Sequence, residues 1–240
     1  MNGLLRGVDA VTFDFFNTLV FHRDGRGRGP TVMDYLAAHG FECAPWRHEI
    51  LYEVFAGYER VGAATLPEEA QRARRITLAK RLFECLEIAA SEGDAERHAD
   101  ALWRLLGPDS LEVYSDVAAT LDALRSEGLP LAIVSNWPCG LGHFCTELGI
   151  AEYFDAILCS AEVGAAKPDP RIFAEAIARL RVDPARVLHI GDTVVDDYDG
   201  AVAAGLRAVL IARNGGLPAG GAPVIRSIAE LTPGNRGQSP

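Results

Sequence analysis

Short runs of apolar residues recur along the chain, and most are rich in branched side chains. Each run is seven or eight residues long and ends in polar residues or a turn. Runs of this length and composition are typical of strands buried on both faces of a sheet. The predicted strands are DAVTFDFF (9–16), LPLAIVSN (129–136), FDAILCS (154–160), RVLHIGD (186–192) and LRAVLIA (206–212).

Between the later runs the apolar residues recur at helical spacing. The predicted helices are VAATLDALRSEG (117–128), GLGHFCTELGI (140–150), PDPRIFAEAIARL (168–180) and DDYDGAVAAG (196–205). Strands that alternate with helices favour right-handed crossovers and a parallel sheet. We therefore expect an α/β protein with a doubly wound parallel sheet.

The segment from about residue 30 to 107 interrupts this alternation. It carries helical patterns, in TVMDYLAAHG (31–40) and in the long stretch 68–90, and no convincing strand. We interpret it as an α-helical insertion after the first strand, with HRDGRGRGP (22–30) as one hinge and 107–116 near the other. The expected domains are a core of residues 1–22 and 108–240 and a helical cap of residues 23–107. The Gly/Pro-rich tail from 214 is expected to be irregular, apart from a short strand-and-helix pattern at 223–231.

Charge and composition argue against several classes of binding partner and binding site. The net charge of −10 repels polyanions, so nucleic acids and anionic membranes are not expected partners. The chain has no apolar run of membrane-spanning length, and its amino terminus lacks the apolar core of a signal peptide, so we expect a cytoplasmic protein. Five cysteines without a C-x-x-C pair indicate neither a disulfide framework nor a zinc site. Only two of the 23 basic residues are lysines, Lys80 and Lys167.

Polar residues end the predicted strands. Asp14 interrupts the apolar stretch TFDFFNTLV (12–20), Ser135 and Asn136 end the second strand, and Asp192 ends the fourth. An unpaired carboxylate in apolar surroundings costs several kcal/mol or more, so Asp14 requires a compensating role. Ligands of open parallel sheets bind at the carboxyl ends of the strands, and these side chains should converge there.

Four segments, in this order, resemble the four motifs of the haloacid dehalogenase-like (HAD) hydrolase superfamily. They are FDFFNTL (13–19), IVSN (133–136), AAKPDP (165–170) and HIGDTVVDDYDGA (189–201). Asp14, Lys167 or the Asp196–Asp197 pair would each have an ordinary structural explanation alone, such as a strand-end cap or a helix amino terminus. Four motifs in order favour the family, which implies a Rossmann-like core with a helical cap inserted after the first motif.

The resemblance also implies roles for individual residues. Asp14 corresponds to the nucleophile that forms a covalent aspartyl intermediate, and Thr18 of the same motif is a further expected catalytic residue. Ser135 and Asn136 match the residues that hold the transferring group, and Lys167 matches the lysine that neutralises charge. Asp192 resembles the Mg²⁺ ligand. Asp14, the Phe16 carbonyl and Asp197 complete the expected metal ligands, and Asp196 is a further supporting carboxylate. This chemistry is independently reasonable, because phosphoryl transfer depends on positioning and charge neutralisation and Mg²⁺ prefers carboxylates.

Phe16 departs from the phosphatase pattern. Phosphatases of the superfamily have a second aspartate at this position, which acts as general acid and base. The main-chain carbonyl of Phe16 can still bind a metal, but its side chain cannot donate a proton. Loss of a general acid costs about 10²–10⁴ in rate, mostly for leaving groups that need a proton. His22 and Asp24 are candidate substitutes.

Four interpretations therefore remain open. The favoured one is a Mg²⁺-dependent phosphatase of a small phosphorylated metabolite. The runner-up is a 2-haloacid dehalogenase, a branch that also lacks the second aspartate but works without magnesium, which leaves Asp192 unexplained. A phosphonoacetaldehyde hydrolase would need a cap lysine, for which Lys80 is the sole candidate, although a surface role suits its basic helix better. The fourth is a protein that binds a phosphometabolite with little turnover. The sequence identifies neither the substrate nor the oligomeric state.

Overall fold

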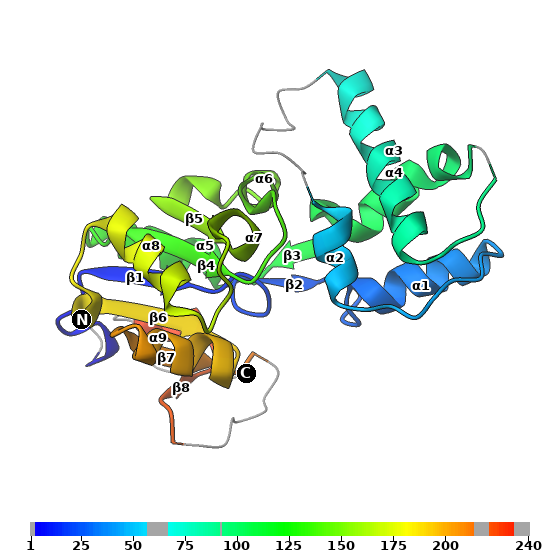
Figure 1. Ribbon diagram of the computed structural model, residues 1–240. Helices are drawn as coiled ribbons and strands as arrows, with labels where there is room; N and C mark the ends of the chain where they lie inside the picture. The colour runs from blue at the N-terminus through cyan, green and yellow to red at the C-terminus, as the bar shows by residue number, and fades with distance from the viewer. Residues whose placement is uncertain (1–2, 57–66, 92, 214–220, 233–240) are drawn as a thin grey trace. The chain divides into compact units, whose positions relative to one another are not determined.

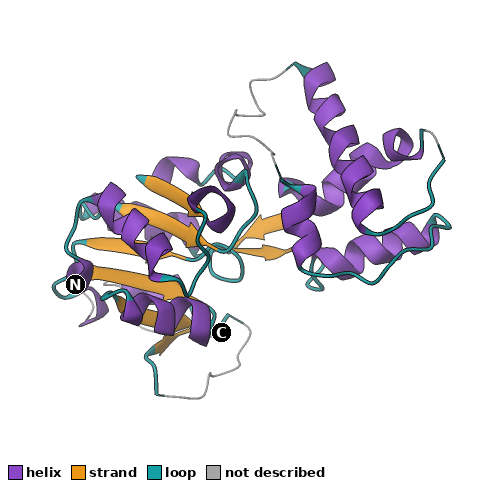
Figure 2. Cartoon of the chain, in the orientation of Figure 1, coloured by secondary structure: helices purple, strands orange, loops and turns teal. Residues whose placement is uncertain are grey.

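A six-stranded parallel sheet forms the centre of one of the two units of the chain. The computed structural model describes residues 3–56, 67–91, 93–213 and 221–232. Within these residues the strands lie in the order β5-β4-β1-β6-β7-β8, and all neighbours are parallel (Figures 1 and 2). The strands are β1 (Ala10–Phe13), β4 (Leu131–Ser135), β5 (Ala156–Cys159), β6 (Val187–Gly191), β7 (Arg207–Ile211) and β8 (Val224–Ile225). The predicted α/β fold class, with a doubly wound parallel sheet and a Rossmann-like core, is confirmed.

The central position of β1 aligns the ends of three strands. Phe13, the last residue of β1, pairs with Ile133 of β4 on one side and with Ile190 of β6 on the other. All four residues of β1 are buried, and three of them are apolar, as expected of a strand covered on both faces. The carboxyl ends of β4, β1 and β6 are therefore level with one another. The residues that come directly after these three strands lie at the same edge of the sheet.

The described helices of the sheet unit include three predicted segments, α5 (Val117–Ser126), α8 (Pro170–Leu180) and the segment that contains α9 (Gly200–Ala203), together with the short α7 (Ser160–Val163), which was not predicted. A π-helical turn spans Val194–Asp199. The amino terminus of α8 is fixed by Pro170 at its first position and by Asp169, whose carboxylate accepts the Arg171 backbone N–H. Phe173 of α8 is fully buried in a cluster with Ala132 and Val134 of β4. The alternation of side chains along β4 explains why these two residues share one face.

A second, helical unit contains the insertion. Contacts divide the chain into a unit of Met1–Phe21, Val113–Trp137 and Gly149–Pro240 and a unit of His22–Glu112 and Pro138–Leu148. The helices of the second unit are α1 (Arg28–Ala38), α2 (Glu49–Val54), α3 (Glu68–Cys85), α4 (Asp94–Leu106) and α6 (Leu141–Glu147). The long helices α3 and α4 pack against each other through buried aliphatic residues such as Leu82 and Leu102. The segment 138–148, including α6, groups with this unit, whereas the sequence analysis assigned it to the core.

Two short strands lie where the chain passes between the units. β2 (Val20–His22) and β3 (Leu111–Val113) form a two-stranded sheet that the sequence analysis did not predict. Three residues are too few to show an alternating pattern, and their pairing joins parts of the chain about 90 residues apart. The predicted tail pattern is found as β8 and a 3₁₀ turn over Ile228–Leu231, which begins with a capping box between Ser227 and Glu230. Of the helices that the structure describes, none combines the length and apolarity that crossing a membrane requires.

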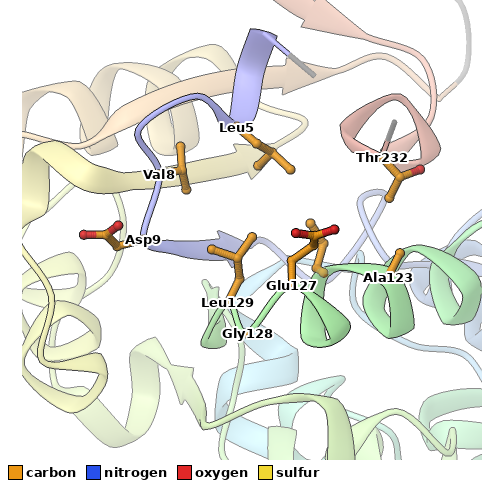
Figure 3. Close-up of a pocket in the computed structure, with 9 residues that line it drawn as sticks. Leu5, Val8, Asp9, Ala123, Glu127, Gly128, Leu129 and Thr232 are labelled. Carbon is orange, nitrogen blue, oxygen red and sulfur yellow. The ribbon is translucent and has the colours of Figure 1, made fainter. Parts of the chain in front are cut away.

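A cavity of about 390 Å³ opens in the sheet unit (Figure 3). Leu5, Val8 and Asp9, which precede β1, line one side of it, and Gly128 and Leu129, which precede β4, line another. The cavity is therefore at the amino ends of these parallel strands. Ligands of such sheets bind at the opposite, carboxyl ends, so this cavity is not the candidate active site.

Candidate active site

Asp14 lies at the carboxyl end of β1, at the centre of a group of polar side chains. Its backbone N–H donates to the Ile190 carbonyl of β6 at 2.8 Å, which fixes the residue at the end of the strand. Its carboxylate Oδ1 accepts hydrogen bonds from the Ser135 hydroxyl at 3.0 Å and from the Lys167 ammonium at 2.6 Å. The predicted convergence of strand ends thus brings together Asp14, Ser135 and Lys167.

The charges of Asp14 and Lys167 stabilise each other in a buried site. Burial raises the pKa of Asp14, and the charge of Lys167 opposes that rise. Burial alone would lower the pKa of Lys167, but the charges of Asp14 and Asp197 outweigh it and raise that pKa. Lys167 therefore stays protonated, and its ammonium favours the ionised carboxylate that a nucleophile requires.

Asn136 fixes the backbone of Lys167. Its amide oxygen accepts the Lys167 backbone N–H at 2.7 Å, and its amide nitrogen donates to the Lys167 carbonyl at 2.9 Å. The same nitrogen is 3.4 Å from a carboxylate oxygen of Asp196. Asn136 thus holds the loop that carries the lysine, although the sequence analysis assigned it to the transferring group.

Asp197 is buried and accepts hydrogen bonds on both carboxylate oxygens. Lys167 Nζ and His189 Nε2 contact Oδ1 at 2.5 and 3.2 Å, and the backbone N–H and hydroxyl of Thr193 donate to Oδ2 at 2.9 and 2.7 Å. Burial by itself would raise the pKa of Asp197, but the charge of Lys167 and the hydrogen bond from His189 outweigh it and hold this pKa well below its usual range. Gly191 leaves room for this carboxylate, because a Cβ at that position would overlap it.

Asp192 completes a group of three carboxylates. Oxygens of Asp14, Asp192 and Asp197 all lie within 4.8 Å of one another, and this is the group among the described residues that could hold a metal ion. Burial, followed by the negative charges of Asp14 and Asp197, raises the pKa of Asp192 to about 7. The Asn17 amide donates to Asp192 at 3.3 Å. Three acids with one lysine leave excess negative charge, which a divalent cation would neutralise.

The remaining candidates of the first motif lie in the loop after Asp14. Phe16 is half-buried, and its ring centroid is 6.4 Å from that of Trp137. Among the described residues, backbone or arginine N–H groups donate to the loop carbonyls of Phe15, Thr18 and Leu19 and not to that of Phe16, which leaves the Phe16 carbonyl available to a ligand. Thr18 is fully buried, and its hydroxyl has no hydrogen-bond partner among the residues that the structure describes.

The helical unit contains the two candidate substitutes for the general acid, His22 and Asp24, and the candidate Schiff-base lysine, Lys80. His22 Nδ1 and a carboxylate oxygen of Asp24 are 2.5 Å apart, and His22 is buried. Hydrogen bonds from Thr31, Arg26 and His22 outweigh desolvation and lower the pKa of Asp24, so this carboxylate stays ionised and is a poor proton donor. Lys80 is exposed on α3 and shows none of the burial that would activate an amine.

Asn17, Thr193 and His189 belong to the site, although their sequence context predicted no role for them. Asn17 has a positive φ of 59°, a conformation that asparagine tolerates, and it lies three residues after the nucleophile. Thr193 follows Asp192 directly. His189 lies within the fourth resembling segment without an assigned role, yet its Nδ1 is 2.9 Å from the Thr12 hydroxyl while its Nε2 donates to Asp197. For His189 the alternation of side chains along β6 was a usable signal. Successive residues of a strand point to opposite faces, so His189 faces away from the side of the sheet that Ile190 covers.

Comparison with known proteins agrees with this geometry. The family model described as haloacid dehalogenase-like hydrolase matches residues 8–205. Haloacid dehalogenase-like hydrolase domain-containing protein 3 of Mus musculus is 43% identical over 115 residues, or 48% of this chain and 46% of the relative. The chain therefore spans about half the length of such relatives. Phosphoserine phosphatase of Thermus thermophilus is 33% identical over 179 residues, which cover 70% of this chain and 68% of that protein.

Two solved structures match most of the chain equally well. They are a HAD phosphatase from Thermococcus onnurineus and a 2-haloacid dehalogenase from Pseudomonas syringae pv. Tomato DC3000. Each has a TM-score of 0.60 and 25% identity and covers 93% of this chain and 96% of its own. Overall similarity therefore does not separate the two chemistries, but the family match spans most of the chain and contains every strand-end residue of the site. The chain belongs to the haloacid dehalogenase-like hydrolases.

Proposed function

We propose that this hydrolase is a Mg²⁺-dependent phosphatase of a small phosphorylated metabolite, which works through an aspartyl-phosphate intermediate on Asp14. The observation that carries the proposal is the carboxylate group of Asp14, Asp192 and Asp197 around a single lysine. A dehalogenase mechanism has no use for Asp192, whereas a metal-dependent phosphatase needs it. The relatives named as phosphatases support the same choice.

The donor set fits Mg²⁺, which prefers hard oxygen ligands. Both oxygens of Asp197 already accept hydrogen bonds, whereas Asp14 Oδ1 is bonded and its Oδ2 has no partner among the described side chains. We therefore assign Asp14, Asp192 and the Phe16 carbonyl as direct ligands, and Asp197 as the residue that orients Lys167. The metal when bound would neutralise charge on the phosphoryl oxygens.

The side chains of this site would act in two steps. An Asp14 oxygen attacks phosphorus, the bond from phosphorus to the leaving-group oxygen breaks, and that oxygen departs with the bonding electrons. Water then attacks phosphorus and gives up a proton to the solvent, the bond from phosphorus to Asp14 breaks with its electrons returning to the carboxylate, and phosphate leaves. Lys167 and Ser135 hold the Asp14 carboxylate ionised and oriented for the first step, and they stabilise the same carboxylate as it is released in the second.

Because of Phe16, the rate of hydrolysis should depend strongly on the leaving group of the substrate. The Phe16 ring cannot protonate a departing alkoxide, so acyl and aryl phosphates are expected to react much faster than alkyl phosphates. His22 is the remaining candidate donor, because Asp24 orients its Nδ1 and its buried Nε2 has no hydrogen-bond partner among the described atoms. We further assign residues 23–107 as the substrate-selecting cap, and the cytoplasm as the site of action.

The second candidate is a 2-haloacid dehalogenase. The observation in its favour is Phe16, because halide departs without a proton. A catalytically weak phosphometabolite-binding protein is the third. The exposed position of Lys80 does not support a phosphonoacetaldehyde hydrolase, since a Schiff-base lysine is activated by desolvation in an apolar pocket.

The test is a substrate panel assayed with Mg²⁺ and with EDTA. The panel contains alkyl phosphates, p-nitrophenyl phosphate, acetyl phosphate and 2-chloropropionate. Mg²⁺-dependent phosphate release, fastest from the acyl and aryl substrates, is expected. Chloride release that EDTA leaves unchanged would instead establish the dehalogenase. Binding of phosphate without turnover of any substrate would favour the third candidate.

A further inference from the structure

Arg213 lies just after β7, at the same sheet edge as the candidate active site. Its guanidinium donates two hydrogen bonds to the Thr18 carbonyl, from Nε at 3.2 Å and from Nη2 at 2.7 Å. Nη1 donates to the Asp116 carboxylate at 2.7 Å. One side chain thus links the loop after the nucleophile to the start of α5.

Three neighbours hold the guanidinium in one orientation. Its side chain is only 7% exposed, and its Cζ lies 4.0 Å from the ring centroid of Tyr114. Asp116 is fixed in turn by the Ser227 hydroxyl at 2.5 Å and the Ile228 backbone N–H at 3.0 Å. A planar group with this many aligned contacts acts as a rigid support, which a flexible ammonium cannot reproduce.

The loop that Arg213 supports carries residues of the site. Inside the loop, Leu19 N–H and Val20 N–H donate to the Phe15 carbonyl at 2.9 and 3.1 Å. Asn17, which precedes Thr18, donates to Asp192, and Phe16 follows the nucleophile by two residues. Movement of the Thr18 carbonyl would therefore displace the Asn17 amide and the Phe16 backbone together.

We infer that Arg213 is a positioning residue for the reaction: by holding the Thr18 carbonyl it fixes the loop of residues 15–19, and with it Asn17 against Asp192 and the Phe16 carbonyl beside Asp14. This inference rests on the proposed function, because it assigns the loop to the hydrolytic site. No motif of the family resemblance includes Arg213.

The test compares Arg213→Lys with a control on the same strand. Arg207, at the amino end of β7, also donates to two backbone carbonyls, those of Leu4 and Arg6, at 2.8 and 2.9 Å. Arg207→Lys therefore removes a similar guanidinium support away from the site. For each protein we would measure thermal stability, kcat and KM for p-nitrophenyl phosphate, and hydrogen exchange of the Leu19 and Val20 amides.

Arg213→Lys is expected to lower kcat by about 10–100-fold, because misplacement of catalytic groups by about 1 Å costs up to about 10² in rate. KM should change little, and exchange of the two loop amides should accelerate. Arg207→Lys should leave kcat and loop exchange unchanged at a similar loss of stability. Added guanidinium should restore part of the kcat of Arg213→Ala but not raise that of the control.

Unchanged loop exchange in Arg213→Lys would overturn the inference, and so would faster exchange with wild-type kcat. If the wild-type protein hydrolyses no phosphate, the proposed function fails, and loop exchange alone decides whether Arg213 positions the loop. If Arg213→Lys does not fold, Asp116→Asn replaces it in the same measurements. This variant keeps Arg213 but removes the charge of the carboxylate that orients its guanidinium.

Discussion

Replacement of Lys167 by methionine tests the electrostatic arrangement of the site. The side chain of Lys167 is 2% exposed and contacts Asp14 at 2.6 Å and Asp197 at 2.5 Å. Methionine has a similar length but no charge, so the change leaves two buried carboxylates facing each other without a cation. The variant should lose all turnover and much of its stability.

The expected loss of stability follows from burial. Removing one partner of a buried ion pair costs about 3–5 kcal/mol, since the other charge stays uncompensated. For a chain of this length, about 2–4 °C of Tm is lost per kcal/mol, so Tm should fall by roughly 6–20 °C. The loss should be near the lower end at acidic pH, because a carboxylate that takes up a proton no longer needs a cation.

The pH dependence has a definite sign. Burial already raises the pKa of Asp14, and the variant loses the lysine charge that opposes this rise. A carboxylate with a raised pKa binds more protons in the folded state, so the stability of the variant should fall as pH increases above the unfolded value of 3.8. In the wild type, the lowered pKa of Asp197 acts in the opposite direction, and its contribution is lost as pH falls below 3.8.

Urea denaturation at pH 5 and pH 8 in EDTA, followed by circular dichroism, measures the effect. Lys80→Met is the matched control, because it removes the other lysine of the chain from an exposed position and should cost less than about 0.5 kcal/mol. A Lys167→Met protein within about 1 kcal/mol of wild type at pH 8 would refute the reasoning. Asp197→Asn in the same chain should recover part of the loss, since it removes one of the two opposed charges.

Further predictions concern the nucleophile, the metal and the missing acid. Asp14→Asn should abolish turnover of every substrate without altering circular dichroism, and wild-type turnover would exclude covalent catalysis by Asp14. Asp192→Asn should weaken Mg²⁺ binding at least about tenfold by calorimetry, because it removes a charged ligand; unchanged affinity would remove Asp192 from the ligand set. Phe16→Asp should raise alkyl phosphatase activity by at most about 10²–10⁴ and flatten the dependence of kcat on leaving-group pKa. Equal slopes before and after that change would point to another proton donor, with His22 the next to test.

Long apolar runs made most of the sheet predictable. The five predicted strands are found, because a strand buried on both faces needs a mostly apolar sequence. The pair β2 and β3 was missed, since three-residue strands carry no period and gain their stability from distant partners. The grouping of α6 with the helical unit likewise depends on tertiary contacts that its amphipathic sequence does not encode.

Strand ends also made part of the site predictable. Asp14, Ser135 and Asp192 follow three adjacent strands, so the rule for parallel sheets brings them together. The hydrogen bond of Lys167 to Asp197 was not predictable, because it depends on the π-helical turn that carries the aspartate. Thr18 shows the same limit: its motif made it a catalytic candidate, whereas the contact that the structure shows is the one between its carbonyl and Arg213.

The central position of β1 has a consequence for how the protein is made. The nucleophile is synthesised early, but Ser135 lies 121 residues later and Lys167 153 residues later. Both strands that flank β1 are thus still missing when Asp14 leaves the ribosome, and β6 is complete only at Gly191. Closing such long loops is slow, which makes parallel pairing of this kind a late event in folding. A nascent chain therefore carries its reactive carboxylate without a cation partner, and hydrolytic activity can begin only after nearly the whole core has been translated.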